Sequence, residues 1–314
     1  MKFLEDKRIA RELEKSLKEK TLSHAYLFYG PRGIGKCQMA KSFAKTMICG
    51  EDPRDKSFCQ LAHDFDHPDL IFIKSQGSIK KAQVEELIDR VGQKPFESQY
   101  KVVIIDNFHN MTTEGQNALL KTLEEPPSYL NLFLISHNLK GILPTIKSRC
   151  RLMKFKTVST NRLESFLQDY GISEKNARLF ARLSKGSVAQ SLRYYEDSTL
   201  LQKREELIDQ VDRLLREGRY TVFSSLDYFK DHREQIDEIL GFLLTWFRDL
   251  SFMALGQEEN IINIDKLELL QLENVSLTHS LHCYDSVLQT VEELKMNINF
   301  DLAIQMLLMN IGGI

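Results

Sequence analysis

Residues 30–37, with the sequence GPRGIGKC, restrict the fold of this chain more than any other segment. They follow the pattern G-x-x-x-x-G-K-[ST] up to its last position. In that pattern, glycines let successive backbone N–H groups surround phosphate oxygens, and the lysine reaches the outer phosphates. The apolar run at 24–29 predicts a buried strand before the loop, and residues 38–48 predict a helix after it. This order predicts an α/β fold with a phosphate loop (P-loop), although a glycine-rich turn that binds nothing stays an alternative.

The last position of the loop departs from the pattern in a way that affects metal binding. The pattern places a serine or threonine hydroxyl there to hold Mg²⁺, and this chain has Cys37. Mg²⁺ is a hard cation that prefers oxygen, so a neutral thiol coordinates it poorly. We therefore expect a degenerate ATP/Mg site. The residues that we expect to contact the phosphates of a bound nucleotide are Gly30, Gly33, Gly35 and Lys36.

The second half of the same site is predicted at residues 101–106 (KVVIID). A run of β-branched residues without polar alternation is typical of a central parallel strand that is buried on both faces. Asp106 then lies at the carboxyl end of the strand, the edge at which α/β sheets bind ligands. Hydrolysing enzymes of this type usually carry a glutamate next, to orient the attacking water, and this chain has Asn107. We expect this amide to slow turnover severely and to leave binding intact.

Strand-like and helix-like segments alternate in the first half of the chain, and helical patterns follow alone. The apolar runs at 69–74, 101–106 and 130–136 are separated by helical patterns at 79–91 and 114–123. Such alternation is typical of a parallel sheet covered by helices. Later segments place apolar residues at three- and four-residue spacing. We predict an α/β P-loop domain at 1–155, a small helical lid at 156–200 and an all-helical collar for oligomerisation at 201–314.

The charge and the apolar runs of the chain limit its partners and its location. A net charge of −2 argues against a dedicated nucleic-acid-binding protein, which is usually strongly basic. Lys80 and Lys81 begin a helical segment that could meet DNA phosphates in an assembly, although such a pair is usually a solvated face. We expect weak DNA binding, or none, by the isolated chain. The charged N-terminal segment is no secretory signal, and no apolar run reaches membrane-span length, so we expect a cytoplasmic protein without membrane contact.

A zinc site is a further candidate. Cys49 and Cys59 flank a polar segment that continues through His63, Asp66 and His67. Zinc prefers thiolate and imidazole ligands, and Cys49, Cys59 and His63 are the candidate ligands. The spacing is irregular and no C-x-x-C pair is present, so a surface loop with two ordinary thiols is the competing interpretation.

Several of these segments together resemble a known protein family. They are SHAYLFYGPRGIGK, HPDL at 67–70, KVVIID, NALLKTLEEPP at 117–127 and LPTIKSRC at 143–150. The chain resembles the delta-prime subunits of the bacterial DNA polymerase III clamp loader, which are AAA+ proteins. The resemblance covers the first 155 residues, and WFRDL at 246–250 supports it in the helical remainder.

The resemblance assigns roles to two further places in the sequence. Ser148-Arg149-Cys150 is similar to the family's SRC motif, whose arginine enters the ATP site of the adjacent motor subunit. A guanidinium is permanently charged and binds phosphate oxygens bidentately, which suits this role. Without the resemblance, Arg149 would be interpreted as a surface or ion-paired arginine. Asn138 follows the strand at 130–136, at the place of the family's first sensor, and a turn residue is the alternative.

The resemblance also implies a chain that does not hydrolyse ATP itself. Motor subunits of the family carry a lid motif G-S-M-R with a sensor arginine, and residues 186–189 (GSVA) place Ala189 there. The implied function is a clamp-loader stator in DNA replication that presents Arg149, as an arginine finger, to an ATPase motor subunit. The implied partners are that subunit, a clamp-opening subunit and, through the hetero-oligomer, the sliding clamp and primed DNA. An active ATPase motor subunit and a P-loop nucleotide kinase are the alternatives.

Overall fold

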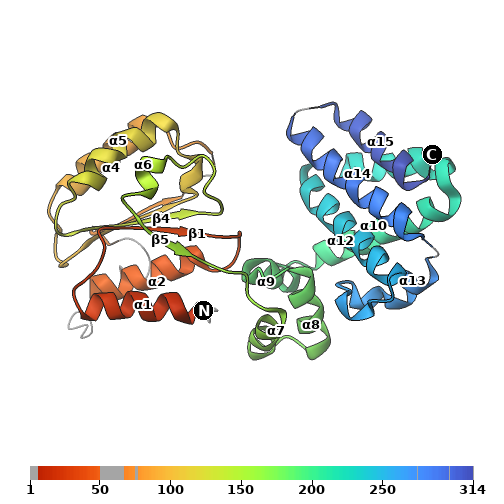
Figure 1. The fold of residues 1–314 in the computed structure, drawn as a ribbon, viewed down its shortest axis with the longest axis horizontal. Coiled ribbons are helices and arrows are strands. Elements are labelled where there is room, and N and C mark those ends of the chain that lie inside the picture. Colours follow the sequence, from red (N-terminus) through yellow and green to blue (C-terminus); the bar gives the residue numbers. More distant parts are fainter. Residues whose placement is uncertain (1–5, 50–66, 75–76, 274, 297, 314) are drawn as a thin grey trace. The chain divides into compact units, whose positions relative to one another are not determined.

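The computed structural model describes residues 6–49, 67–74, 77–273, 275–296 and 298–313 (Figure 1). Contacts between residues divide the chain into two compact units. Unit 1 comprises Met1–Ser159 and the short segment Gly186–Ala189, and unit 2 comprises Thr160–Lys185 and Gln190–Ile314. The three-part division with boundaries at 155 and 200 stays a prediction.

Unit 1 is a parallel five-stranded sheet of order β2-β3-β4-β1-β5, covered by helices. Helices α1 and α2 lie on one face of the sheet and α4, α5 and α6 on the other (Figure 1). The fold confirms the predicted α/β class. The elements are α1 (Lys7–Lys18), β1 (Ala25–Tyr29), α2 (Lys36–Cys49), β2 (Leu70–Lys74), α4 (Lys81–Gly92), β3 (Lys101–Asp106), the 3₁₀ turn η1 (Phe108–Asn110), α5 (Thr113–Glu124), β4 (Leu130–Ser136), α6 (Pro144–Lys147) and β5 (Arg151–Lys154).

Alternate residues of the inner strands fill two cores, one on each face of the sheet. In β3, Val103 and Ile105 belong to the core that includes residues of α4 and α5, whereas Val102 and Ile104 belong to the core with α1 and α2. All four side chains are completely buried. Because both faces are covered, the strand needs apolar residues at every position, which explains the uninterrupted run in the sequence.

The sequence prediction lacks α1, η1, α6 and β5 of unit 1, although the four strands predicted between residues 24 and 136 are confirmed as β1 to β4. Helix α1 is amphipathic and buries Ile9 and Leu13, and Asp6 caps it by accepting from the N–H groups of its first turn. Strand β5 has four residues, pairs with β1 and buries only Met153. A short edge strand with one buried side chain carries too few residues for a periodic signal.

Unit 2 is helical, as predicted, and within the described ranges no strand follows β5. None of the described helices is long and apolar enough to cross a bilayer. The elements are α7 (Thr160–Asp169), α8 (Glu174–Leu183), α9 (Val188–Glu196), α10 (Ser198–Glu217), η2 (Gly218–Thr221), α11 (Val222–Asp231), η3 (Arg233–Gln235), α12 (Ile236–Ala254), η4 (Glu258–Asn260), η5 (Ile264–Lys266), α13 (Leu267–Leu272), α14 (Leu277–Lys295) and α15 (Phe300–Ile311).

A buried polar network fixes the segment between α12 and α13. Asp249 is completely buried, and its Oδ2 accepts from the backbone N–H of Ile262 at 2.9 Å and of Asn263 at 2.7 Å. The side-chain amide of Asn263 donates to the same oxygen at 2.7 Å. The buried guanidinium of Arg204 donates to Asn263 Oδ1 and, at 2.8 Å, to both carboxylate oxygens of Asp265. A network that satisfies its buried charges holds its loop in one conformation.

A pair of carboxyl groups in unit 2 makes stability depend on pH. Burial, and then the neighbouring Asp212, raise the pKa of Glu273 to about 7, against the opposing charge of Arg216. The folded chain therefore binds more protons at Glu273 than the unfolded chain between about pH 4.5 and 7, and the resulting stability is lost as pH rises through 7. We expect the free energy of unfolding to fall by about 1 kcal/mol from pH 6 to pH 8, since the group is partly exposed.

Urea unfolding of the native chain and of the Glu273→Gln variant at both pH values measures this effect. The variant should lose the pH dependence. Glu268→Gln, which changes an exposed carboxylate of α13, should retain it. Equal pH dependence in all three proteins would contradict the assignment to Glu273.

Candidate functional site

The phosphate loop connects β1 to α2 at the carboxyl edge of the sheet. Gly30 and Gly33 have φ angles of +144° and +72°, which side-chain-bearing residues rarely adopt. A Cβ at Gly30 would lie 2.3 Å from the backbone oxygen of Phe155, and one at Gly33 would lie 2.1 Å from Ser187 Oγ. Glycine is thus required at both positions by conformation and by space.

Lys36 is held inside the loop by the loop's own carbonyl groups. It is 6% exposed, and its Nζ donates to Gly30 O at 2.7 Å and also to Pro31 O. Burial lowers the pKa of Lys36 to about 8, while the charge of Asp106 acts in the opposite direction. Phosphate oxygens of a ligand would take the place of these carbonyl oxygens as acceptors.

Cys37 and Asp106 lie close enough to interact electrostatically. Burial, and then the carboxylate of Asp106, raise the pKa of Cys37 to about 11, so the thiol is protonated at neutral pH. Asp106 is the last residue of β3, and its Oδ1 accepts from the N–H of Asn107 at 2.9 Å. A neutral thiol does not supply the oxygen ligand that Mg²⁺ requires. The loop therefore fits a phosphate group better than the magnesium ion that usually accompanies it.

Two histidines that the sequence analysis did not identify lie beside the loop. His109 is in η1 after β3, His137 directly follows β4, and their ring centroids are 3.7 Å apart. Burial, and then the positive charges around it, lower the pKa of His137 to about 4, and burial and the charge of Arg32 lower that of His109. Both imidazoles are therefore neutral at neutral pH. The available sequence signal was that each lies shortly after a strand, at the ligand-binding edge.

Asn138 lies at the same edge of the sheet, in a short turn after β4. Its N–H donates to Ser136 Oγ at 3.3 Å, and the Ser136 hydroxyl donates to Asn138 O. Asn138 Oδ1 is buried and accepts no hydrogen bond from the described residues. The turn agrees with the interpretation of Asn138 as a turn residue. The unsatisfied amide oxygen agrees with its interpretation as a sensor, so both interpretations remain.

The segment Gly186–Ala189 lies against the phosphate loop. The backbone N–H of Ala189 donates to Gly33 O at 3.0 Å. Ser187 occupies the space next to Gly33 into which a Cβ would project. Residue 189 is therefore next to the place where a nucleotide phosphate would bind, and its methyl side chain brings no charge there.

The SRC motif follows α6, and its three side chains differ in their surroundings. Cys150 is 8% exposed and packs into the core with α5, and burial raises the pKa of its thiol to about 12. Ser148 is exposed, and its hydroxyl donates to Thr145 O at 3.0 Å. Arg149 lies between them with a side chain that is 34% exposed. Cys150 thus anchors the segment, while Arg149 points to the surface.

Arg149 is engaged in an ion pair within the chain. Its Nη2 lies 2.7 Å from Glu124 Oε1 at the end of α5, and its Nη1 donates to Thr145 O at 3.0 Å. Glu124 is 49% exposed, so solvent screens the pair and it contributes about 0–1 kcal/mol. The ion pair with Glu124 therefore contributes little to the stability of the fold.

Gln116 ties the SRC segment to α5. It is 1% exposed, and its amide nitrogen donates to Gly141 O at 2.7 Å and to Met111 O at 3.1 Å. Its amide oxygen accepts from the N–H of Leu143 at 2.9 Å, directly before α6. The sequence analysis did not identify this residue, because a lone glutamine carries no signal of what it will contact.

The zinc candidates fall largely outside the described part of the chain. Cys59, His63 and Asp66 lie outside it, Cys49 ends α2, and the described residues contain no cluster of three metal-ligating side chains. His67 is buried, and its Nδ1 accepts from the N–H of Asp69 at 3.1 Å. His67 therefore has a structural role in the turn before β2, and the zinc site stays a prediction.

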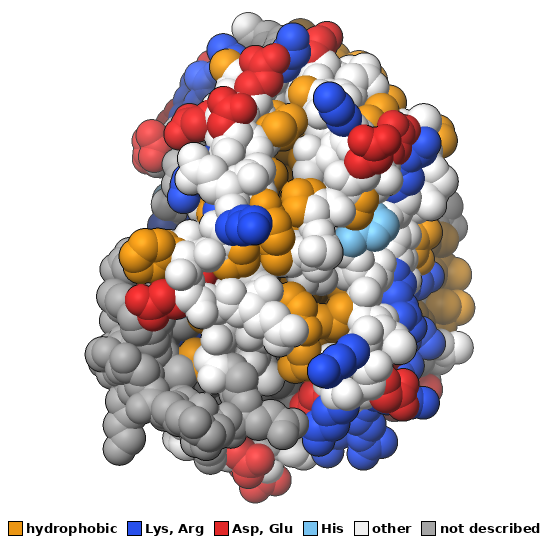
Figure 2. All heavy atoms as spheres, turned by 90° about the vertical axis from the view of Figure 1, so that its left-hand side faces the viewer, with side chains coloured by type: hydrophobic (Ala, Val, Ile, Leu, Met, Phe, Trp, Pro, Cys, Tyr) orange, Lys and Arg blue, Asp and Glu red, His pale blue; other side chains and the backbone are white. Residues whose placement is uncertain are grey.

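On the face that Figure 2 shows, Lys and Arg side chains lie mostly along the right and lower right, with a few Asp and Glu side chains among them, and more Asp and Glu side chains lie at the upper left. Lys81 in the predicted basic pair forms an ion pair with Glu85 at 3.2 Å. An ion pair of this spacing is common on the solvent-exposed face of a helix and does not by itself indicate a DNA-binding site. Weak DNA binding by the isolated chain stays a prediction.

The fold and the loop define a P-loop-type α/β protein with a helical second unit. The family model described as "DNA polymerase III, delta subunit" matches residues 5–159, and "DNA polymerase III, delta subunit, C terminal" matches residues 198–312. DNA polymerase III subunit delta' of Bacillus subtilis is 30% identical over 306 residues, which cover 93% of this chain and 92% of the relative. The chain belongs to this delta-prime family of DNA polymerase III subunits.

Other relatives match shorter parts of the chain. Subunit delta' of Pseudomonas aeruginosa is 38% identical over 136 residues, 41% of this chain and 42% of the relative. Subunit tau of Bacillus subtilis is 36% identical over 160 residues, 49% of this chain and 28% of the relative. A solved gamma subunit-related protein from Thermotoga maritima covers 96% of both chains at 19% identity with a TM-score of 0.49, too distant a likeness to bear on function.

Proposed function

We propose that this chain is the stator of a clamp loader: it does not hydrolyse ATP, and it supplies an arginine finger to an adjacent ATPase subunit. One contrast within unit 1 carries the proposal. Cys37 is a half-buried, neutral thiol at the metal-ligand position of the chain's own loop, while Arg149 lies at the surface on a segment anchored by Cys150. The chain thus lacks the metal-binding hydroxyl of its own nucleotide site, but it carries an arginine that can act in the nucleotide site of another subunit.

Two further substitutions support the absence of hydrolysis. Asn107 follows Asp106 where a water-orienting glutamate is usual, and its backbone is in the left-handed conformation. Ala189 hydrogen-bonds to the phosphate loop but brings no cation to it. Hydrolysis depends on positioning water and on neutralising charge that develops on the γ-phosphate. A nucleotide held by the loop amides and Lys36 would therefore be a structural ligand of this chain.

The arginine finger would act by exchange of ion-pair partners. In the isolated chain Arg149 pairs with Glu124, and at an interface a γ-phosphate with several anionic oxygens competes for the same guanidinium. Charge is then stabilised where it develops in the transition state, and the positively charged group is already oriented by α6. Glu124 thus keeps Arg149 extended at the surface until the neighbouring subunit presents its nucleotide.

The proposed partners follow from the family. The adjacent ATPase is a motor subunit, for which tau-type relatives are the model, and a clamp-opening subunit completes the ring. The assembly places a sliding clamp on primed DNA in the cytoplasm during DNA replication. Contacts of this chain with the clamp and the DNA are made through the complex.

The purified chain is expected to show no magnesium-dependent ATP turnover. The measurement compares phosphate release by the native chain with that by Lys36→Ala, which removes the ammonium of the loop. We expect equal rates at the level of the background, because Cys37 provides no metal oxygen and Asn107 no carboxylate.

Two outcomes of the same assay would favour the alternatives. Turnover that requires Lys36 would indicate an active motor subunit, and transfer of the γ-phosphate to a nucleoside monophosphate would indicate a kinase. Release of phosphate that persists in Lys36→Ala does not arise from this loop.

A further inference from the structure

A basic pocket in unit 2 has no part in the function proposed above. It lies where α7, α8 and α12 meet the segment that follows α12, and its volume of about 580 Å³ suits a small ligand. Its four cations outnumber the two carboxylates that line it, Glu164 and Glu259, although one of the cations, Arg248, also pairs with the buried Asp249 at 2.8 Å. The cations are Arg178, Arg182, Lys185 and Arg248.

Two of these cations build the pocket wall. Nη1 of Arg182 donates to Glu259 O at 3.3 Å and also to Ile261 O, and Nη1 of Arg248 donates to Asn260 O at 3.1 Å. Together they hold the 259–261 segment, whose far side is fixed by the buried network of Asp249. Each guanidinium keeps further N–H groups, because an arginine has five. The wall is thus rigid and still offers donors.

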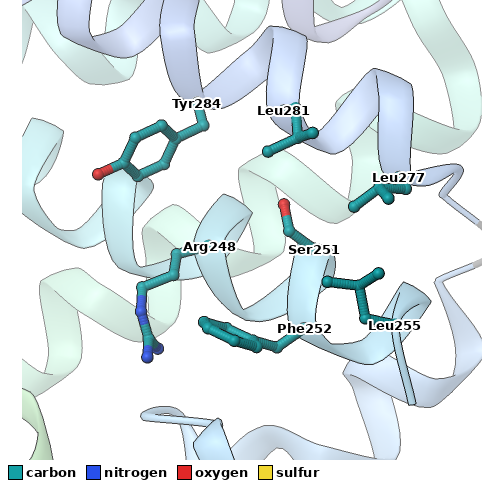
Figure 3. A pocket seen from close by; sticks show the side chains of 7 residues that line it. All are labelled: Arg248, Ser251, Phe252, Leu255, Leu277, Leu281 and Tyr284. Carbon is teal, nitrogen blue, oxygen red and sulfur yellow. The ribbon is translucent and has the colours of Figure 1, made fainter. Parts of the chain in front are cut away.

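The guanidinium of Arg248 is also held by an aromatic ring. Arg248 stacks over Phe252, with 4.4 Å from the guanidinium carbon to the ring centroid. Figure 3 shows Arg248 and Tyr284 at one end of a neighbouring groove and Leu255 and Leu277 at the other, with Phe252 between them. Stacking and the bond to Asn260 together orient Arg248 before any ligand arrives.

The other two cations have no comparable structural role. Arg178 is exposed and, within the described part of the chain, makes no ion pair or hydrogen bond through its side chain. Lys185 follows α8 with a left-handed backbone (φ 50°), a position at which glycine is usual. Lys185 is exposed at the pocket rim; partial desolvation, and then the positive charge of Arg248, lower the pKa of its ammonium, against the attraction of Asp249, so Arg248 and Lys185 repel each other. An anion would relieve this repulsion.

The first turn of α7 completes the pocket. Thr160 and Asn161 line it, and the N-terminus of a helix adds positive potential. We propose that this pocket binds a phosphate group, carried either by a small organic phosphate or by a nucleic acid strand. A phosphate concentrates its charge and accepts the paired donors of arginine, whereas an extended acidic peptide would also meet Glu164 and Glu259.

Isothermal titration of the full-length chain with inorganic pyrophosphate tests the proposal. Arg178→Gln and Lys185→Gly should each weaken binding by about tenfold, because each removes a charged hydrogen-bond donor. Lys175→Gln, which removes an exposed cation of α8 outside the pocket, should leave binding unchanged. Lys185→Gly also relieves the left-handed backbone, so its melting temperature should stay within a few degrees of native.

A second arm identifies the source of the phosphate. A thymidine 15-mer that competes with pyrophosphate, and whose binding is weakened by the same two variants, would assign the site to nucleic acid. Binding of pyrophosphate alone would assign it to a small phosphate. Pyrophosphate held at the phosphate loop would be insensitive to both variants, so unchanged affinity in folded Arg178→Gln and Lys185→Gly overturns the proposal, as does the absence of any binding.

Discussion

Arg149→Ala is expected to lower the ATP turnover of the reconstituted clamp loader, measured with clamp and primed DNA, by about 10³-fold or more. Under the proposed function, the variant removes the group of the SRC segment that meets the γ-phosphate of the adjacent subunit, since Cys150 is buried and the hydroxyl of Ser148 donates within its own turn. A loss of this size corresponds to about 4 kcal/mol of transition-state stabilisation. The effect should appear in the turnover number, because charge on the γ-phosphate develops in the transition state.

Three controls separate the finger from assembly and folding. Sedimentation or size exclusion should show the same complex for native chain and variant, because the exposed ion pair with Glu124 contributes little to stability. Glu124→Gln removes the ion pair and keeps Arg149, so turnover should be retained. Arg149→Lys keeps the charge but loses the bidentate geometry, and we expect an intermediate rate. Native turnover in an intact Arg149→Ala complex would refute the arginine finger and leave a scaffold.

Asp249→Ala is expected to reduce the free energy of unfolding by about 3–5 kcal/mol. Its carboxylate is completely buried and accepts from three N–H groups through Oδ2, while Oδ1 accepts from Arg248 at 2.8 Å. Removal would leave buried donors of Ile262 and Asn263 without an acceptor, and each such group costs about 1–3 kcal/mol. Equilibrium unfolding in urea measures the change.

Asp249→Asn is the matched variant, because it keeps the shape of the side chain. With its oxygen in the position of Oδ2, the amide still accepts from Ile262 and Asn263, and only the pairing with Arg248 is lost. We therefore expect a clearly smaller loss than for Asp249→Ala. Equal losses would assign the stability to the negative charge, and no loss in either variant would contradict the structural role of the network.

The local patterns of the sequence were sufficient for the framework of unit 1. A few residues are enough to identify the loop at 30–37 and the strands at 101–106 and 130–136. Phosphate loops and buried parallel strands each require particular residue types at consecutive positions. The carboxyl ends of such parallel strands all lie at the same edge of the sheet, which is the edge that binds ligands. The positions of Asp106 and Asn138 therefore followed without knowledge of the tertiary contacts.

The elements that were missed lack a signal of this kind. Strand β5 is held in the sheet by β1, more than 100 residues earlier in the chain, and only one of its side chains is buried. His109 and His137 approach each other only because β3 and β4 are neighbours with their carboxyl ends together. Neither the strand nor the pair of rings leaves a periodic trace in the sequence.

By itself, the sequence determined that this protein contains a P-loop fold with a thiol at its metal position and that an SRC segment follows the sheet. These features depend on residue type and on neighbours along the chain. Only the tertiary structure decided that Arg149 pairs with Glu124, that Ala189 lies against Gly33, and that cations of α8, of α12 and of the segment after α8 line one pocket. Those contacts join residues distant in sequence, and the free energy that selects them comes from packing of whole elements.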